Sequence, residues 1–396
     1  MRDRKREVAI VGVGQTKYSS HREDVNQPEM ISEAIFEALE QTSLTMDDID
    51  CIVHGNMELF EMIYQPDLWH TIGTGASGKE CLRLTTGGTT GATLVCAADA
   101  LVASGMHDIV MAIGFEKLQE GHTTGGITNM ADPLWGRKLQ SGALVGITAT
   151  QMIEEFGEER AKKASIDYRI IMDMHAMKNP KAHRRLGLNF DMAEDLMNNS
   201  PQLVGELRMI HMCSQSDGAC VVILASEDKA KEICDRPAWI LDHVTVHREE
   251  HMGTLFGFKK EKLTHRHAAE VLFKRNNIND PVNEFDVFEM YDPSSWWGVD
   301  WLREFLLFDG DEHLKLVENR EILIDGKFPV NPSGGVIASN PIGATAMVRF
   351  AEAALQIMGK AGEHQVKKEV NKALASGFGG TFWTVLGILT ADKPKR

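Results

Sequence analysis

Residues 288–295 (FEMYDPSS) place a tyrosine and an aspartate, Tyr291 and Asp292, directly after a short strand-like run. Functional groups of α/β sheets commonly lie where strands end. A tyrosine hydroxyl at such a place can donate a proton, or accept one if its pKa is lowered. The other interpretation is a tyrosine that is only packed and hydrogen-bonded, and the residue type and spacing alone leave both open.

Two glycine-rich loops lead into apolar segments. Residues 87–91 (GGTTG) precede one such segment, and residues 331–335 (NPSGG) with 339–345 (SNPIGAT) precede another. Backbone N–H groups at a helix start are unpaired and attract an oxyanion or a carbonyl oxygen. The alternative for residues 87–91 is that their glycines only permit close packing. An earlier pair, Gly12 and Gly14, lacks the third glycine of a dinucleotide-binding loop and is expected to be structural.

The elements that must position these loops follow an α/β pattern. We expect strands at residues 7–14, 52–53, 107–114, 218–225, 238–246 and 285–288, and helices from Pro28, at 91–104, 166–177 and 268–275, and from Gly343. The run at residues 7–14 (EVAIVGVG) is apolar at nearly every position, which is typical of a strand in a parallel sheet. Residues 115–212 are largely irregular and glycine-rich, so we expect an inserted covering region there.

The second half of the chain repeats the first in outline. The tripeptide GAT opens the apolar helix of each half, at residues 91–93 and 343–345, and a helix followed by a short strand precedes it in both. Two matches in the same order indicate a duplicated α/β unit with a cleft where the halves meet. We expect an N-terminal half at residues 1–236, with the covering region at about 116–212, and a C-terminal half at residues 237–396.

The composition argues against several classes of protein. The 57 Asp and Glu residues exceed the 42 Lys and Arg residues, giving a net charge of -15, so nucleic-acid binding is not expected. No run approaches 18 apolar residues and the N-terminus lacks the apolar core of a signal peptide, so we expect a cytoplasmic protein that does not bind membranes. The six cysteines lack metal-ligand spacing, so no metal site is expected.

The sequence resembles the thiolase superfamily, and within it the sterol-carrier-protein-type thiolases. The resemblance runs in order from about Val8 to Leu389, and besides the two loops it rests on residues 102–117 (VASGMHDIVMAIGFEK), 175–182 (HAMKNPKA), 216–219 (SDGA) and 377–380 (GFGG). It implies an α/β fold, the thiolase-like five-layered fold of two duplicated βαβαβαββ halves with an inserted covering-loop region. It also implies a homodimer, and a coenzyme A thioester bound beneath the covering region.

The departures from the family pattern concern its reactive side chains. The resemblance places Gly88 where the family has its nucleophilic cysteine, and Tyr291 and Asn340 where it has histidines. Gly379 lies among terminal glycines where the family has a cysteine or histidine. Without the nucleophile and base, ordinary acyl transfer has no covalent intermediate. The candidate catalytic residues are therefore Tyr291, Asn340, Asp292, Gly88 and Gly379.

Two reactions and one non-catalytic role remain. Retro-aldol cleavage of a β-hydroxyacyl-CoA needs one base, one proton donor and a site for the enolate oxygen, and it needs no acyl-enzyme. This hypothesis resembles a branch of cysteine-free thiolase-like aldolases that work with a small zinc-ribbon and OB-fold partner protein. The alternatives are an atypical thiolase that cleaves a β-ketoacyl-CoA with free coenzyme A as direct acyl acceptor, and a non-catalytic thiolase-like subunit.

Coenzyme A, as thioester substrate or product, is the expected cofactor. The residues expected to bind it are Arg137, Lys138, Arg184 and Arg185 in the covering region, and Ser333 and Gly334 in the second loop. Trp296, Trp297 and Trp301 follow Tyr291 closely. They either line an apolar acyl pocket or pack under the covering region, and we favour packing slightly.

Overall fold

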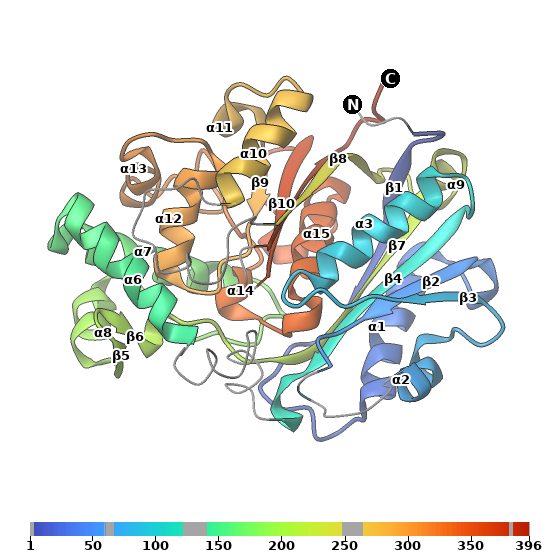
Figure 1. Ribbon diagram of the computed structural model, residues 1–396, viewed down its shortest axis with the longest axis horizontal. Coiled ribbons are helices and arrows are strands. Elements are labelled where there is room, and N and C mark those ends of the chain that lie inside the picture. Colours follow the sequence, from blue (N-terminus) through green and yellow to red (C-terminus); the bar gives the residue numbers. More distant parts are fainter. Residues whose placement is uncertain are drawn as a thin grey trace.

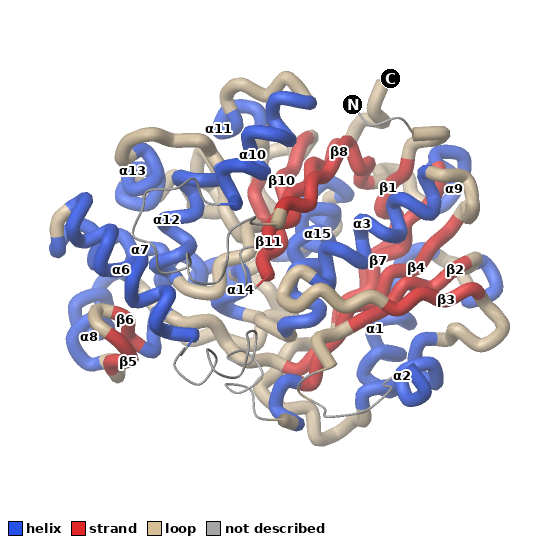
Figure 2. The backbone as a smooth tube through the Cα atoms, viewed as in Figure 1, coloured by secondary structure: helices blue, strands red, loops and turns tan. Residues whose placement is uncertain are grey.

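The computed structural model of the protein describes residues 4–58, 60, 67–121, 141–247, 264–379 and 383–395. Within this part of the chain, nine strands form one mixed sheet (Figure 2). Their order across the sheet is β3 (Glu80–Arg83), β2 (Cys51–Gly55), β4 (Ile109–Lys117), β7 (Asp217–Ser226), β1 (Val8–Gln15), β8 (Ala238–Val246), β11 (Trp383–Thr390), β10 (Lys372–Gly379) and β9 (Val287–Glu289). Two short strands, β5 (Gln202–Val204) and β6 (Leu207–Arg208), pair separately.

Helices and sheet alternate in five layers (Figure 1). Helix α1 (Gln27–Thr42) packs on β1 and β7, and α10 (Thr264–Arg275) packs on β8 and β11. Helices α3 (Thr90–Ala103) and α15 (Ile342–Met358) lie against each other in the centre, where both contact β4 and β10. From one side to the other, the layers are helix α1, the part of the sheet with β1 and β7, the helix pair, the part of the sheet with β8 and β11, and helix α10. This order confirms the expected five-layered α/β fold.

The covering region is more helical than its sequence suggests. Helices α6 (Ser141–Phe156) and α7 (Glu158–Ala176) occupy much of it, followed by α8 (Ala193–Asn199). We expected a helix only from residue 166. The first part of α7, residues 158–165 (EERAKKAS), carries five charged side chains and buries only Ala161, Ala164 and Ser165, so its sequence shows no apolar stripe.

The remaining helices lie around this framework. They are α2 (Asp67–Thr74), α9 (Glu227–Ile233), α11 (Pro281–Glu284), α12 (Ser295–Phe305), α13 (Glu312–Glu318) and α14 (Gly335–Ala338). Helix α12 packs on α6, α7 and α10, and thereby connects the covering region to the C-terminal strands. Among the helices described, none is both long enough and apolar enough to cross a membrane.

Strand β1 joins the two parts of the sheet. It pairs with β7 on one side and with β8 on the other, where Ala9 lies opposite Trp239, and both pairings are antiparallel. The expectation that residues 7–14 belong to a parallel sheet was therefore wrong. All eight residues of β1 are buried because helices cover both faces of the sheet, and burial on both faces does not specify the direction of a neighbouring strand.

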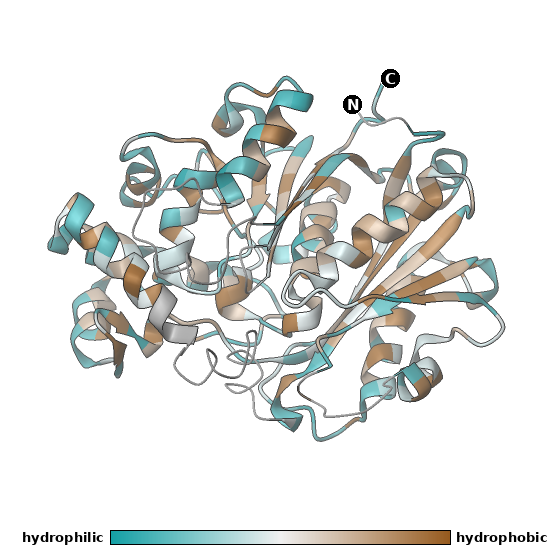
Figure 3. Cartoon of the chain, in the orientation of Figure 1, coloured by the Kyte–Doolittle hydropathy of each residue, from teal (hydrophilic) through white to brown (hydrophobic). Residues whose placement is uncertain are grey.

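The two central helices fix where the glycine-rich loops meet. Apolar side chains dominate the strands and both helices (Figure 3), and 16 of the 17 residues of α15 are buried. Helix α3 approaches α15 closely at Gly91, where a Cβ atom would lie 2.4 Å from the backbone nitrogen of Met347. This contact brings the N-terminal ends of α3 and α15 together, and both expected loops with them.

Candidate functional site

The loop before α3 meets the end of β10 backbone to backbone. A Cβ atom at Gly88 would lie 2.5 Å from the carbonyl oxygen of Phe378 and 3.4 Å from the Cα atom of Gly379. Gly379 in turn faces Thr89, whose side chain would lie 3.4 Å from a Cβ at that position. Gly88 and Gly379, which lie far apart in the sequence, are therefore neighbours, and the backbone leaves no room for a side chain at position 88.

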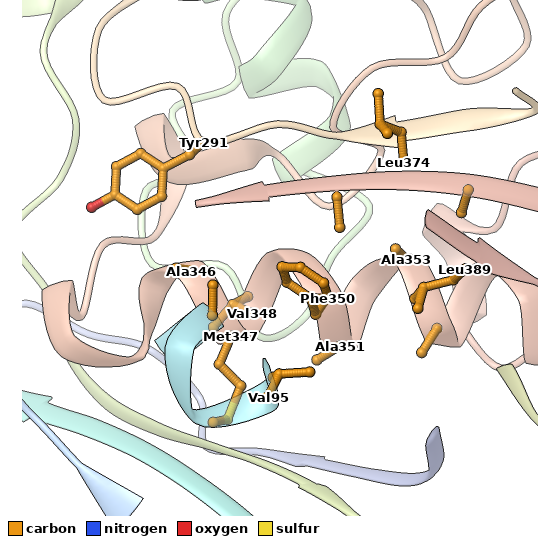
Figure 4. Close-up of a cluster of buried hydrophobic side chains, with 14 of the residues drawn as sticks. Val95, Tyr291, Ala346, Met347, Val348, Phe350, Ala351, Ala353, Leu374 and Leu389 are labelled. Atoms are coloured by element: carbon orange, nitrogen blue, oxygen red, sulfur yellow. The ribbon is translucent and has the colours of Figure 1, made fainter. Parts of the chain in front are cut away.

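Tyr291 lies beside this junction, two residues after β9. Its backbone N–H donates to the Ser376 hydroxyl at 2.9 Å, and its ring centroid lies 6.1 Å from that of Phe378. Figure 4 shows the ring at the edge of a buried apolar cluster, with the hydroxyl directed away from the other labelled side chains. The residue is 3% exposed, yet its hydroxyl has no hydrogen-bond partner among the described residues.

Burial determines the protonation state of Tyr291. Loss of solvent, and then the nearby Cys213 and Asp292 groups, raise the pKa of the phenol well above its usual value, although Arg349 opposes them. Of the two roles open to Tyr291, the environment favours the proton donor, because the phenol stays neutral near neutral pH.

Asn340, in the loop before α15, is held by α15 and by the chain before β7. Its side-chain oxygen accepts from the Thr345 hydroxyl at 2.8 Å, and its backbone N–H donates to the Ser216 hydroxyl at 3.1 Å. The Ser216 hydroxyl also bonds the His183 imidazole at 2.9 Å. The Asn340 amide nitrogen has a weaker acceptor, the Cys213 sulfur at 3.4 Å.

Cys213 is a member of this group that the sequence did not single out. The side chain is half-buried, and burial raises the pKa of its thiol to about 11, although Arg184 and Asn340 act in the opposite direction. The sulfur is therefore a neutral thiol near neutral pH rather than a thiolate. One signal was available in the sequence, because Cys213 lies three residues before the SDGA segment at 216–219 that supported the family resemblance.

Asp292 points to a different set of partners from Tyr291. One carboxylate oxygen accepts from the backbone N–H of Val336 at 2.6 Å, and the other accepts from the Tyr168 hydroxyl at 3.0 Å. Burial raises the pKa of Asp292 to about 7, against the opposing effects of Arg349 and of these hydrogen bonds. Both oxygens are thus occupied by the protein, which suits a positioning role.

The described arginines among the residues expected to bind coenzyme A contact different parts of the chain. Arg184 donates to the backbone oxygen of Met212 at 2.6 Å, beside Cys213, whereas the exposed Arg185 donates to that of Met177 at 2.7 Å. Arg137 and Lys138 lie outside the described residues.

The second loop is occupied by internal contacts. The buried Ser333 hydroxyl donates to Glu289 at 2.7 Å and accepts from Arg349 at 2.8 Å. Gly334 has a φ of 97° and caps the start of α14 against Ala176. Ser333 is therefore committed to a buried ion pair, and its hydroxyl is not free to hold a phosphate.

An aromatic group packs against the ring of Phe378. The rings of Trp297 and Trp301 stack at 4.8 Å between centroids, and both lie within 5.7 Å of the Phe378 ring. Trp296 is fully buried and contacts His211, and Trp301 is 1% exposed. Packing therefore accounts for Trp296 and Trp301, while Trp297, at 9% exposure, lies closest to the surface.

Known protein sequences similar to this chain include thiolase-family proteins. Residues 263–390 match a protein-family model described as thiolase C-terminal domain-like. The acetyl-CoA acetyltransferase of Methanothermobacter thermautotrophicus is 30% identical over 374 residues, covering 91% of this chain and 94% of that protein. Sterol carrier protein 2 of Gallus gallus is 25% identical over 386 residues, covering 91% and 68%.

Solved structures share the fold over nearly the whole chain. One described as an Ltp2-ChsH2(DUF35) aldolase superposes with a TM-score of 0.81 at 20% identity, covering 98% of this chain and 99% of that one. Human mitochondrial 3-ketoacyl-CoA thiolase superposes with a TM-score of 0.71 at 14% identity, with coverages of 98% and 99%. At these identities the likeness concerns the fold.

Proposed function

Since this chain belongs to the thiolase superfamily, we propose that it makes or breaks a C–C bond next to a coenzyme A thioester, by retro-aldol cleavage of a β-hydroxyacyl-CoA. In that reaction a base takes the proton of the β-hydroxyl, whose C–O bond becomes the carbonyl of one product. The bond between Cα and Cβ breaks, and its electron pair forms the enolate of the shortened acyl-CoA. The enolate then takes a proton at Cα.

The observation that carries the proposal is the free hydroxyl of Tyr291. No described residue engages this hydroxyl, so it is available to a bound ligand that accepts a hydrogen bond from it. The neutral phenol is suited to donate to the enolate oxygen as negative charge develops there. Tyr291 therefore serves as the donor, so the base that accepts the β-hydroxyl proton is a different group.

The junction at Gly88 supports a reaction without an acyl-enzyme. We assign Gly88 to the family position of the nucleophilic cysteine. No nucleophile is present there, and a Cβ atom would lie 2.5 Å from the Phe378 oxygen. We further propose that Gly88, Gly379 and the Asn340 amide border the thioester, with Asp292 holding the strand end that carries Tyr291.

Assembly and coenzyme A binding extend the proposal. We propose a homodimer and a small zinc-ribbon and OB-fold partner protein, as the family resemblance implies. The description of the superposed aldolase structure also names two components, Ltp2 and ChsH2(DUF35). Arg184, next to Cys213, together with Arg137 and Lys138 is proposed to face the coenzyme A phosphates. Arg185 lines a different pocket, so we assign it elsewhere.

The second candidate is an atypical acyltransferase. Its support is the 30% identity to a protein described as an acetyl-CoA acetyltransferase, which exceeds the identity to the aldolase structure. In this reaction free coenzyme A attacks the β-keto group directly, and Tyr291 would donate to the same thioester enolate. A non-catalytic subunit is the third outcome that an experiment must distinguish.

The test is a product assay with and without free coenzyme A and partner protein. β-Hydroxyacyl-CoA should yield a shortened acyl-CoA and an aldehyde or ketone without added coenzyme A, and intact-mass spectrometry should show no acyl adduct. Cleavage of β-ketoacyl-CoA that depends on free coenzyme A would favour the acyltransferase. A stable acyl-cysteine would contradict the lyase, and no product under any condition would favour the non-catalytic subunit.

A further inference from the structure

A pocket lies apart from the Tyr291 site. It has a volume of about 480 Å³, within the range of roughly 300 to 1,000 Å³ typical of small-molecule sites. The end of β1, one face of α1, the chain after α7, the last turns of α15 and residues 360–364 line it. Neither Tyr291, Asn340, Asp292 nor Gly88 is among its lining residues, so the mechanism above does not use it.

The lining includes a buried ion pair. The Glu352 carboxylate lies 2.8 Å from Nε2 of His364 and accepts from the Gln15 amide at 2.9 Å. Burial alone would lower the pKa of His364, but the Glu352 charge and hydrogen bond raise it above its usual value. The pair with Glu352 therefore favours the cationic imidazole, and the Nδ1 atom of His364 is buried without a hydrogen-bond partner among the described residues.

Positive charges are concentrated in this lining. Lys181 is already neutralised, because its ammonium lies 2.8 Å from Glu37. Lys178, Arg185 and Lys360 also line the pocket, and within the described part of the chain none of them has a carboxylate partner. The remaining acid in the lining is Glu363.

The surplus of positive charge is unusual for this chain. Three cations and one acid that have no ionic partner among the described residues line a single pocket in a protein whose net charge is -15. Fields inside a pocket are set by near groups, because distant surface charges are screened over about 8 to 10 Å of salt solution. The lining therefore attracts an anion although the molecule as a whole repels one.

We propose that this pocket binds a phosphate monoester, with the phosphate between Lys178, Arg185 and Lys360. A dianion compensates most of the surplus charge, and guanidinium and ammonium groups are the usual phosphate ligands. The volume leaves room for an organic group beside the phosphate. The site is separate from the thioester site, so its occupancy does not depend on the proposed reaction.

The first experiment is calorimetric titration at low ionic strength with inorganic phosphate and with glycerol 3-phosphate, against sodium chloride of equal ionic strength. We expect saturable binding of both probes in the millimolar range or tighter, with glycerol 3-phosphate the tighter. No saturable binding, or equal displacement by chloride, would overturn the site. Equal affinity for the two probes would overturn the monoester assignment.

Two double variants test whether phosphate binds in this pocket. The double variant Lys178→Ala with Lys360→Ala should weaken phosphate binding about tenfold or more, equivalent to about 1.4 kcal/mol. A matched control, Lys274→Ala with Lys395→Ala, removes the same charge from exposed positions outside the lining and should leave affinity within about twofold. Equal losses in the two double variants would show a general charge effect and overturn the proposal.

A third variant tests the sign of the effect. Glu363→Gln removes the unpaired acid of the lining and should tighten phosphate binding by about two- to fivefold. A destabilised fold would weaken binding, so tighter binding by this variant cannot be explained by a loss of stability. Unchanged or weaker binding in Glu363→Gln, with a melting temperature equal to that of the wild type, would contradict a phosphate held in this lining.

Discussion

Burial keeps protons on the groups around Tyr291. It raises the pKa of the phenol well above its usual value and that of the Cys213 thiol to about 11. Near neutral pH both side chains are therefore neutral, and the phenol is a hydrogen-bond donor. Such an environment favours stabilising an enolate over generating a thiolate or phenolate nucleophile.

The backbone at Gly88 predicts that a cysteine cannot simply be restored. In Gly88→Cys the new Cβ atom would meet the Phe378 oxygen, so the variant should lose about 1–3 kcal/mol of unfolding free energy. It should also form no acyl-enzyme. Chemical denaturation and intact-mass spectrometry with an acyl-CoA measure the two effects.

Ala100→Cys is the matched control, because it adds the same side chain at an exposed position of α3. It should change stability by less than about 0.5 kcal/mol. An undiminished stability of Gly88→Cys, or a stable acyl adduct on its new cysteine, would show that the loop has room for a nucleophile.

The sequence reveals some members of this site and hides others. Tyr291 and Asn340 could be found because each follows a strand or loop signal that is local in the chain. Cys213 was missed, because its only local signal is its place three residues before the SDGA segment and its contact with Asn340 spans 127 positions. Ser333 was expected to bind coenzyme A from its place in a glycine-rich loop, and its contacts within the fold, with Glu289 and Arg349, come from distant segments that a loop pattern does not reveal.

Between elements, Asp292 links three parts of the fold. It follows β9, accepts from Tyr168 of α7, and accepts from the backbone of Val336 in α14. The covering region is thereby connected to the strand end that carries Tyr291. Burial disfavours the charged carboxylate at this position, so the protonated form of Asp292 is the more stable one up to its raised pKa.

This raised pKa predicts how stability depends on pH. The pKa of Asp292 rises from 3.8 to about 7 on folding, so the folded state binds the proton more tightly and stability falls as pH rises from about 4 to about 7. One such group contributes a slope of up to about 1.4 kcal/mol per pH unit. Asp292→Asn should make the decline shallower, as measured by denaturant unfolding across this range.

A second buried aspartate and an exposed control position define what the pH measurement should show. The buried Asp300, whose pKa burial raises to about 6, keeps part of the slope in the variant, so the decline should lessen rather than vanish. Asp235→Asn alters an exposed aspartate and is the control. A slope in Asp292→Asn equal to those of the wild type and the control would show that the Asp292 carboxyl does not couple folding to protons.

Apolar elements were predictable and polar helices were not. The expected strand at residues 238–246 coincides with β8, and the expected helix at 91–104 is α3 shifted by one residue. Both are read from runs of buried apolar residues. Only the second half of α7 was recognised, because its first part, residues 158–165, is mostly charged and buries only small side chains.

At the scale of the molecule, the sheet ends in an exposed edge at β3. Leu82 of this strand is 46% exposed, and Leu68 and Ile72 of α2 are 76% and 71% exposed. Unpaired strand edges with apolar side chains invite pairing with another chain. The duplication of the α/β unit could be inferred from repeated motifs, whereas the order of strands that leaves β3 at the edge depends on pairing between distant segments.

We predict a homodimer that uses the β3 edge. Light scattering should give about twice the 44.0 kDa mass of the chain at micromolar concentration. Leu82→Lys places a charge on the edge and should shift the mass toward one chain. Met209→Lys alters an exposed methionine of the covering region and should leave the dimer intact. A monomeric wild type, or a dimer that tolerates Leu82→Lys, would contradict this interface.

The most direct test of the central claim is the turnover of Tyr291→Phe on a β-hydroxyacyl-CoA, with the partner protein present. Removing only the free hydroxyl should lower turnover by about 10² to 10⁴ while coenzyme A affinity and the fold stay nearly unchanged. Tyr18→Phe removes another buried hydroxyl, one that already bonds Gln15, and should retain its turnover. If Tyr291→Phe keeps more than half of the wild-type turnover, Tyr291 is a packed tyrosine and the proposed chemistry is wrong.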